Sequence, residues 1–250
     1  MKNALAILVL RKNGHFSFLL RQHKFEVLNL ELIRTEPLDD QSELDALLKR
    51  IANYDGLFIT SPAAAKVFAD RLSSGGHNFL GKVYVLGDRS KRVLKSRGLD
   101  IVFRDKADTA EELIKSFPDA EFADKTFLFI RGERSMRTIP RILGATARID
   151  EIPVYRTIDI TPDAEFVSQI RTRLRRGEIG WLCFFSPSGI KSLGRVFDLD
   201  DIRKTKIAAI GETTATAATG AGWQVDFISR RSGTDDFAES LIEHIKNIEQ

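Results

Sequence analysis

Four short turns in the sequence combine glycine or proline with hydroxyl side chains, where an apolar run gives way to a helical pattern. They are "TSPAA" (60–64), "GDRS" (87–90), "FSPSG" (185–189) and "GETT" (211–214). A helix start offers unpaired backbone N–H groups and the positive end of the helix dipole, which suit an anion such as a carboxylate. A serine or threonine there also serves as a plain helix cap. Each turn therefore predicts a capped helix start, and four together indicate a site for several carboxylates.

Two further residues have side chains that suit the same chemistry. Arg131 follows the apolar run 127–130, so it is predicted to end a strand and to contact an anion or form a surface ion pair. Tyr155, in "EIPVYRT", offers a phenolic proton to a ligand or packs against a neighbour. The sequence contains no phosphate-binding loop, dinucleotide fingerprint, nucleophile elbow or zinc-protease motif. Its four histidines are widely spaced, and we expect no metal site.

The composition indicates a folded protein with an anionic rather than a cationic ligand. With 250 residues, 43% of them hydrophobic, the chain can form one large or two small domains. The net charge of +3 is modest and the basic residues are dispersed, so we expect no nucleic-acid partner. The densest basic run, "RTRLRRGE" (171–178), is predicted to be the solvated face of a helix. Without a membrane-spanning run, a signal peptide or more than one cysteine (Cys183), a cytoplasmic location is expected.

The elements that must hold these turns alternate between strands and helices. Short apolar runs predict strands at 4–10, 56–60, 82–87, 126–132, 180–185 and 206–211. Three sets of apolar residues are spaced as on one face of a helix and predict helices between or after the strands. The sets are Leu44, Leu47, Leu48 and Ile51; Phe166, Ile170 and Leu174; and Phe237, Leu241, Ile245 and Ile248. Strands that are apolar on both faces and separated by helices predict an α/β fold with parallel sheets.

The chain also repeats itself, which predicts two similar domains. The segment 56–72 resembles 180–197, 82–103 resembles 206–228, and 109–114 resembles 234–242. In these matches Ser61 corresponds to Ser186 and Gly87 to Gly211. A weaker match aligns Arg11 with Arg131, each before an apolar helix. In the helix after Arg131, Pro140 is tolerated only in the first turn. Arg134, Arg137 and Arg141 are at helical spacing in the same segment.

Two domain partitions fit the order of these repeats. The chain either divides into tandem domains near residue 120, or its first unit joins the last third. Proline and acidic residues at 34–40 and 155–165 mark two candidate hinges.

The sequence resembles the uroporphyrinogen-III synthase family. The resemblance rests on the segments quoted above and on "GLFITSPAA", "FLFIRGE", "IPVYRT", "CFFSPSGIKSL" and "IAAIGETTATAATGAG". The resemblance implies the exchanged partition: residues 1–35 plus 162–250 form one α/β domain, residues 40–155 form the inserted one, and 36–39 and 156–161 are extended connectors. A ligand cleft is expected between the domains. It also implies a hydro-lyase reaction, in which linear hydroxymethylbilane loses water and closes to uroporphyrinogen III with ring D inverted, without a cofactor or metal. Nothing in the sequence calls for a protein partner, so we expect a monomer.

Site residues are carried over from the family's motifs. Tyr155 is the expected catalytic residue, which assists the departure of water without being indispensable. The expected substrate-binding residues are Ser61, Pro62, Gly87, Ser90, Arg131, Ser186, Ser188, Gly189, Gly211, Thr213 and Thr214. The chain departs from the family at its first strand, which ends in Leu10, Arg11 and Lys12 rather than Thr-Arg-Pro, so no contact is carried over to that loop.

Two other functions fit the same architecture. A hinge-linked two-lobe protein could bind a small anionic ligand without catalysis. A nucleotide-sugar or phosphate-handling transferase would also use helix starts, but it would more often show an acidic metal-binding pair, and Asp88 has no evident partner for one.

Overall fold

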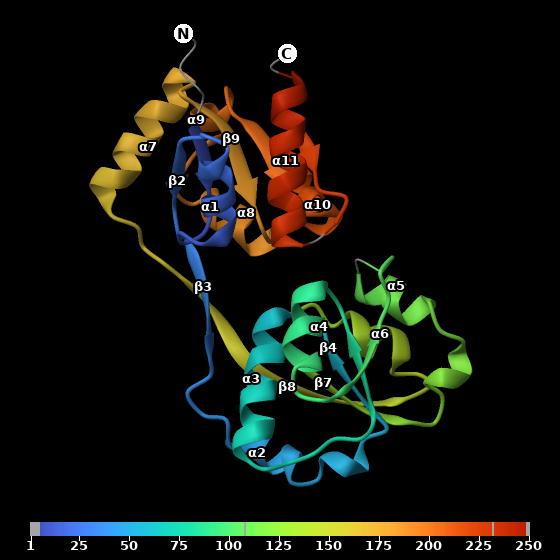
Figure 1. The fold of residues 1–250 in the computed structure, drawn as a ribbon. Coiled ribbons are helices and arrows are strands. Elements are labelled where there is room, and N and C mark those ends of the chain that lie inside the picture. The colour runs from blue at the N-terminus through green and yellow to red at the C-terminus, as the bar shows by residue number, and fades with distance from the viewer. Residues whose placement is uncertain (1–5, 108, 232, 249–250) are drawn as a thin grey trace. The chain divides into compact units, whose positions relative to one another are not determined.

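A computed structural model describes residues 6–107, 109–231 and 233–248 (Figure 1). The chain forms two compact units: Met1–Arg34 with Asp159–Gln250 (unit 1), and Thr35–Ile158 (unit 2). Each is built on a sheet whose neighbouring core strands run parallel, with helices on both faces. The predicted α/β class with two similar domains is confirmed.

Unit 1 contains a five-stranded sheet in the order β11-β10-β9-β1-β2. In Figure 1, α1 and α11 lie side by side over one of its faces. Its elements are β1 (Ala6–Val9), α1 (His15–Gln22), β2 (Val27–Asn29), α7 (Ala164–Arg176), β9 (Ile179–Phe184), α8 (Pro187–Leu193), α9 (Leu199–Ile202), β10 (Lys206–Ala209), α10 (Glu212–Gly220), β11 (Phe227–Ile228) and α11 (Thr234–Ile248).

Unit 2 contains the sheet β3-β8-β7-β4-β5-β6. Its elements are β3 (Ile33–Pro37), α2 (Ser42–Leu48), β4 (Gly56–Ile59), α3 (Pro62–Ser74), β5 (Lys82–Val85), α4 (Asp88–Lys95), β6 (Asp100–Phe103), α5 (Ala110–Lys115), β7 (Thr126–Gly132), α6 (Thr138–Leu143) and β8 (Arg148–Asp159), with 3-10 turns at Ile51–Asn53 and Asp119–Glu121.

Burial on both faces explains why the strands show no polar alternation. In β1, Leu8 packs with one core cluster while Ile7 and Val9 pack with another on the opposite face. In β4, Leu57 and Phe58 are divided between two clusters in the same way. Side chains of successive strand residues point to opposite faces, so both faces of each sheet need apolar residues.

The two sheets have the same strand order, with a different starting point in the chain. Strands β6-β5-β4-β7-β8 occupy the places of β11-β10-β9-β1-β2. The weaker repeat match is therefore confirmed, since β1 and β7 each lie beside the central strand. Register supports it in detail: Val9 pairs with Cys183 and Phe129 with Phe58, which are corresponding positions of the repeat.

The two connecting segments run antiparallel to each other. The amide of Leu38 donates to the carbonyl of Val154 (3.1 Å), and the amide of Ile160 donates to that of Leu32 (2.8 Å). The candidate hinges are thus partly strand, because β3 runs from Ile33 to Pro37 and β8 extends to Asp159.

Two details of the predicted helices are corrected. Helix α2 ends at Leu48, so Ile51 lies in a 3-10 turn, although it is buried as expected. Arg134 and Arg137 precede α6, which begins at Thr138, and they share no helical face with Arg141. Pro140 lies in the first turn of α6, as predicted, where its missing N–H costs little.

Candidate functional site

Ser61 and Ser186 occupy corresponding helix starts in the two units. The Oγ of Ser61 accepts from the amide of Ala64 (3.2 Å), and that of Ser186 from the amide of Gly189 (3.3 Å). A proline follows each serine at the first helical position, where its fixed φ favours the helix. Both serines are therefore N-caps, and the hydroxyl of Ser61 keeps its proton to donate to a ligand.

Ser188 adds a second hydroxyl to the turn in unit 1. Its Oγ lies 3.0 Å from the Oγ of Ser186, and both side chains are half-buried. Pro62 is exposed, whereas Gly189 is buried and takes part through its amide, which donates to Ser186. At the position of Ser188, unit 2 has Ala63, so this second hydroxyl is particular to the turn of unit 1.

The two glycine turns show which of their side chains a ligand can reach. Gly87 has φ of 79°, in the left-handed region that favours glycine, while Gly211 is extended. Ser90 is fully buried, and Thr214 is 4% exposed. These two predicted binding hydroxyls are closed to a ligand in this structure, because the third residue of each helix faces the core.

The second residue of each of these helices is exposed instead. Thr213, predicted from the sequence, is exposed at the start of α10, and Arg89 occupies the corresponding place at the start of α4. Arg89 forms no hydrogen bond or ion pair with any residue that the structure describes. The sequence reasoning missed Arg89, although aligning "GDRS" with "GETT" would have paired it with Thr213.

Arg131 and Tyr155 meet at the carboxyl end of β7. The Nε of Arg131 lies 2.8 Å from Oε2 of Glu151, and its Nη1 donates to the carbonyls of Gly132 (2.9 Å) and Glu133 (3.2 Å). Tyr155 is half-buried beside Gly132 on the neighbouring strand β8. Of the two interpretations of Arg131, the structure shows an ion pair, and Glu151 is a partner that the sequence did not reveal.

Parallel topology gathers these residues at one edge of each sheet. Strands β7, β4 and β5 are adjacent in the sheet, and Gly132, Ser61 and Gly87 lie at or just beyond their carboxyl ends, so the turns lie at the same edge. In unit 1, β9 and β10 bring the Ser186 and Gly211 turns together in the same way. Carboxyl edges are where ligands bind in open α/β sheets.

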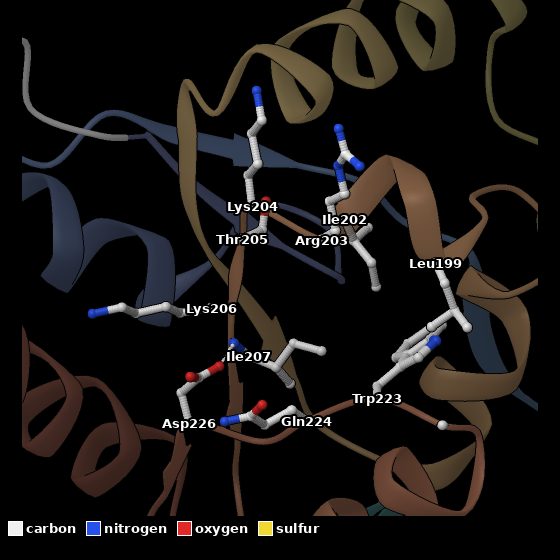
Figure 2. A pocket seen from close by; sticks show the side chains of 11 residues that line it. Leu199, Ile202, Arg203, Lys204, Thr205, Lys206, Ile207, Trp223, Gln224 and Asp226 are labelled. Carbon is white, nitrogen blue, oxygen red and sulfur yellow. Dashed lines mark hydrogen bonds between the residues drawn. The ribbon is translucent and has the colours of Figure 1, made fainter.

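A cavity of about 440 Å³ lies elsewhere in unit 1 (Figure 2). It is lined by α9, the first residues of β10 and the loop before β11, including Leu199, Lys206 and Trp223. Lys206 begins β10 and Gly211 follows its other end, so the cavity is at the opposite edge from the candidate site. We assign it no part in the site.

Charged residues away from the site are largely engaged with one another. The fully buried carboxylate of Asp201 accepts from Arg171 Nε (3.1 Å) and Arg175 Nε (2.6 Å). Burial raises its pKa, but the amide of Asp198 and the two arginines together lower it below the usual value. The basic run of α7 is helical, as predicted, and part of it fixes α9 rather than facing solvent alone. Burial raises the pKa of Cys183, a strand residue as predicted.

Within the described residues, no group of His, Cys, Asp and Glu side chains is arranged to hold a metal ion. The same part of the chain contains no helix long and apolar enough to cross a bilayer.

Comparison with known proteins gives one family. The chain matches the family model described as uroporphyrinogen-III synthase HemD over residues 15–239. It is 29% identical over 205 residues to the uroporphyrinogen-III synthase of Chlorobaculum parvum, covering 78% of this chain and 82% of that one. A chloroplastic uroporphyrinogen-III synthase of Oryza sativa subsp. japonica is 24% identical over 242 residues, covering 94% and 78%.

Solved structures share the fold. A mutant uroporphyrinogen III synthase of the extremely thermophilic bacterium Thermus thermophilus has a TM-score of 0.68 at 17% identity, covering 97% of this chain and 100% of that one. The uroporphyrinogen-III synthetase of Helicobacter pylori 26695 has a TM-score of 0.60 at 15% identity, covering 96% and 99%. None of these relatives supports the binding-protein alternative, and because the family model covers most of the sequence, the chain belongs to the uroporphyrinogen-III synthase family.

Proposed function

We propose that this chain converts linear hydroxymethylbilane into uroporphyrinogen III, with inversion of ring D and loss of water. The observation that carries the proposal is the family match over residues 15–239, which includes every candidate turn. The substrate has eight carboxylates, and the chain has helix-start turns at the carboxyl edges of two similar sheets. We further infer that it acts as a monomer in the cytoplasm.

The binding roles follow from which groups are accessible. Ser61 keeps a donor proton at its helix start, the hydrogen-bonded pair Ser186–Ser188 keeps one of its two protons free, and Thr213 is exposed at another helix start. These hydroxyls, with the backbone N–H groups that follow Gly87 and Gly211, bind acetate and propionate groups of the substrate. Arg89 adds a positive charge in unit 2. Ser90 and Thr214 are buried, and we give them no binding role.

The chemical step needs little from the protein besides conformation and a proton. The pyrrole nitrogen of the substrate expels the hydroxyl group, which takes a proton from the phenol of Tyr155 and leaves as water. Loss of the pyrrole N–H proton to the phenolate then gives the neutral, reactive azafulvene and restores the phenol. Carboxylates held at several turns keep ring D in the orientation that closes with inversion through a spirocyclic intermediate.

The test is the identity of the product. The purified chain is mixed with enzymatically generated hydroxymethylbilane, the products are oxidised, and the type III and type I uroporphyrins are separated by chromatography. We expect a large excess of type III. A folded chain that yields only type I, the product of spontaneous closure, would refute the proposal.

A further inference from the structure

Gly132 stands where a larger residue would collide with Tyr155. A Cβ built on Gly132 would lie 2.4 Å from Cζ, 2.7 Å from Cε2 and 2.8 Å from the hydroxyl oxygen of Tyr155. Carbon atoms in van der Waals contact are about 3.5–4.0 Å apart. The hydroxyl end of the Tyr155 ring therefore rests directly against the backbone of Gly132, in space that only glycine leaves open.

A β-bulge brings Tyr155 into this position. Arg131 pairs with Pro153, but the next residue, Gly132, pairs with Tyr155, so Val154 is an extra residue in β8. Val154 is fully buried in the core cluster that contains Ile152, and Tyr155 packs against the same cluster. In a regular strand these neighbours would point to opposite faces, so the bulge redirects the tyrosine.

The Arg131–Glu151 ion pair supports the strand on which the ring rests. Their side chains are only 16% and 13% exposed, and Nε of Arg131 lies 2.8 Å from Oε2 of Glu151. Arg131 also donates to the carbonyls of Gly132 and Glu133, and the amide of Glu133 donates to the carbonyl of Tyr155 (3.0 Å). The guanidinium is thus neutralised and directed toward the backbone at the bulge.

We propose that Gly132 and the Arg131–Glu151 ion pair are positioning residues that hold the Tyr155 hydroxyl for the reaction. This inference rests on the proposed function, because it concerns the residue that protonates the leaving group. We call the contact of the Tyr155 ring with the backbone of Gly132 the seat of Tyr155. It replaces a carboxylate contact as the role of Arg131. A hydroxyl that must meet one departing oxygen gains from such a seat, since a misplacement of about 1 Å can cost on the order of 100-fold in rate.

The first test is the Gly132→Ala variant with Gly220→Ala as its control. A Cβ at Gly220 meets nothing within 4 Å, so the control should behave as the wild type. Gly132→Ala should lower kcat for type III formation by about tenfold, with KM within about twofold. In a Tyr155→Ala background the ring is absent, and adding Gly132→Ala should change kcat by less than about twofold. Equal losses in both backgrounds would overturn the proposal.

Thermal unfolding tests the seat without using activity. All three tyrosines lie in unit 2 and both tryptophans in unit 1, so the two signals report different units. Gly132→Ala should lower the Tm seen by tyrosine absorbance by roughly 5 °C and leave the tryptophan signal unchanged. The Tyr155→Ala background should abolish this shift; a shift that persists there would contradict the seat.

The ion pair is tested by Arg131→Gln and Glu151→Gln. Both should lower kcat severalfold at unchanged KM, because they loosen the bulge rather than remove a substrate contact. A raised KM for Arg131→Gln alone would show that it binds substrate and would overturn its positioning role. If the wild type formed no type III product, the proposed function would fail, while the Tm results would still decide whether the seat exists.

Discussion

The two units share one strand order, yet their corresponding turns have diverged. At its glycine turn, unit 1 exposes the neutral Thr213, whereas unit 2 exposes the cationic Arg89. The residue that pairs with Val9 in unit 1 is Asn29, and the residue that pairs with the corresponding Phe129 in unit 2 is Glu151. Asn29 donates to the carbonyl of Arg11 (3.1 Å) and to Ser17 Oγ (2.7 Å), whereas Glu151 forms ion pairs with Arg131 and Arg137.

This difference indicates that the two copies of a repeated scaffold have taken different tasks. In both units a serine caps the helix that follows the central strand, and this arrangement suits carboxylate binding. Among the residues that the structure describes, only those of unit 2 combine a glycine, a bulge and an ion pair around a tyrosine. We infer that the two units bind the substrate by the same device and that the proton donor belongs to unit 2.

A carboxylate placed at either shared serine should weaken activity more than any other change. Aspartate caps a helix as well as serine does, so Ser61→Asp and Ser186→Asp should leave the Tm unchanged. Repulsion of substrate carboxylates should lower kcat/KM by about 10- to 100-fold in each variant, or about 1.4–2.8 kcal/mol. The neutral caps Ser61→Asn and Ser186→Asn are the controls. A loss in one unit only would show that the other does not bind carboxylates.

Unit 1 should be the more sensitive of the two to loss of a buried charge. Asp201 is the only fully buried charged side chain among the described residues. Asp201→Asn should destabilise unit 1 by about 2 kcal/mol at pH 7, as followed by tryptophan fluorescence. Because the pKa of Asp201 is lowered on folding, its contribution is present above the unfolded pKa and is lost as pH falls through the folded one. The difference from wild type should therefore shrink below about pH 4; a constant difference would show that the carboxylate contributes no such stability.

Exchanging the exposed residues of the glycine turns should have a weaker effect. Arg89→Thr makes the turn of unit 2 resemble that of unit 1, and it should raise KM about fivefold by removing a charge-assisted contact. Arg92→Thr removes the same charge from an exposed position further along α4 and should leave KM unchanged. Equal effects of the two variants would mean that only the overall charge of the helix matters.

Cys183, in the central strand of unit 1, should respond least to a chemical probe. Burial raises the pKa of its thiol, so the folded chain should react with a thiol reagent only as fast as unit 1 opens. A Leu80→Cys variant of unit 2, made in a Cys183→Ala background, should react at once, because Leu80 is 87% exposed. Rapid labelling of Cys183 in the folded wild type would show that β9 is accessible.

The features that depend on local pattern could be predicted from the sequence. The six apolar runs became strands, and the capping roles of Ser61 and Ser186 followed from "SP" at a helix start. Strands such as β8 and β6 were missed: charged residues such as Asp150 interrupt β8, and β6 has only three apolar residues after Asp100.

The features that could not be predicted depend on contacts between distant residues. The burial of Ser90 follows from how α4 packs, and the partner of Arg131 lies 20 residues away on a strand that was not predicted. The contact between Gly132 and Tyr155 requires a bulge, which no residue pattern in "EIPVYRT" announces. Pattern thus located the turns, and only packing showed which of their atoms a ligand can reach.

A single turnover, with the chain in excess over hydroxymethylbilane, would test the proposed activity most sharply. We expect all substrate to close to the type III isomer, faster than the spontaneous reaction gives type I. We also expect Ser61→Asp and Ser186→Asp each to shift the product toward type I. Formation of type I at the spontaneous rate by the folded wild-type chain would show that it does not catalyse this closure.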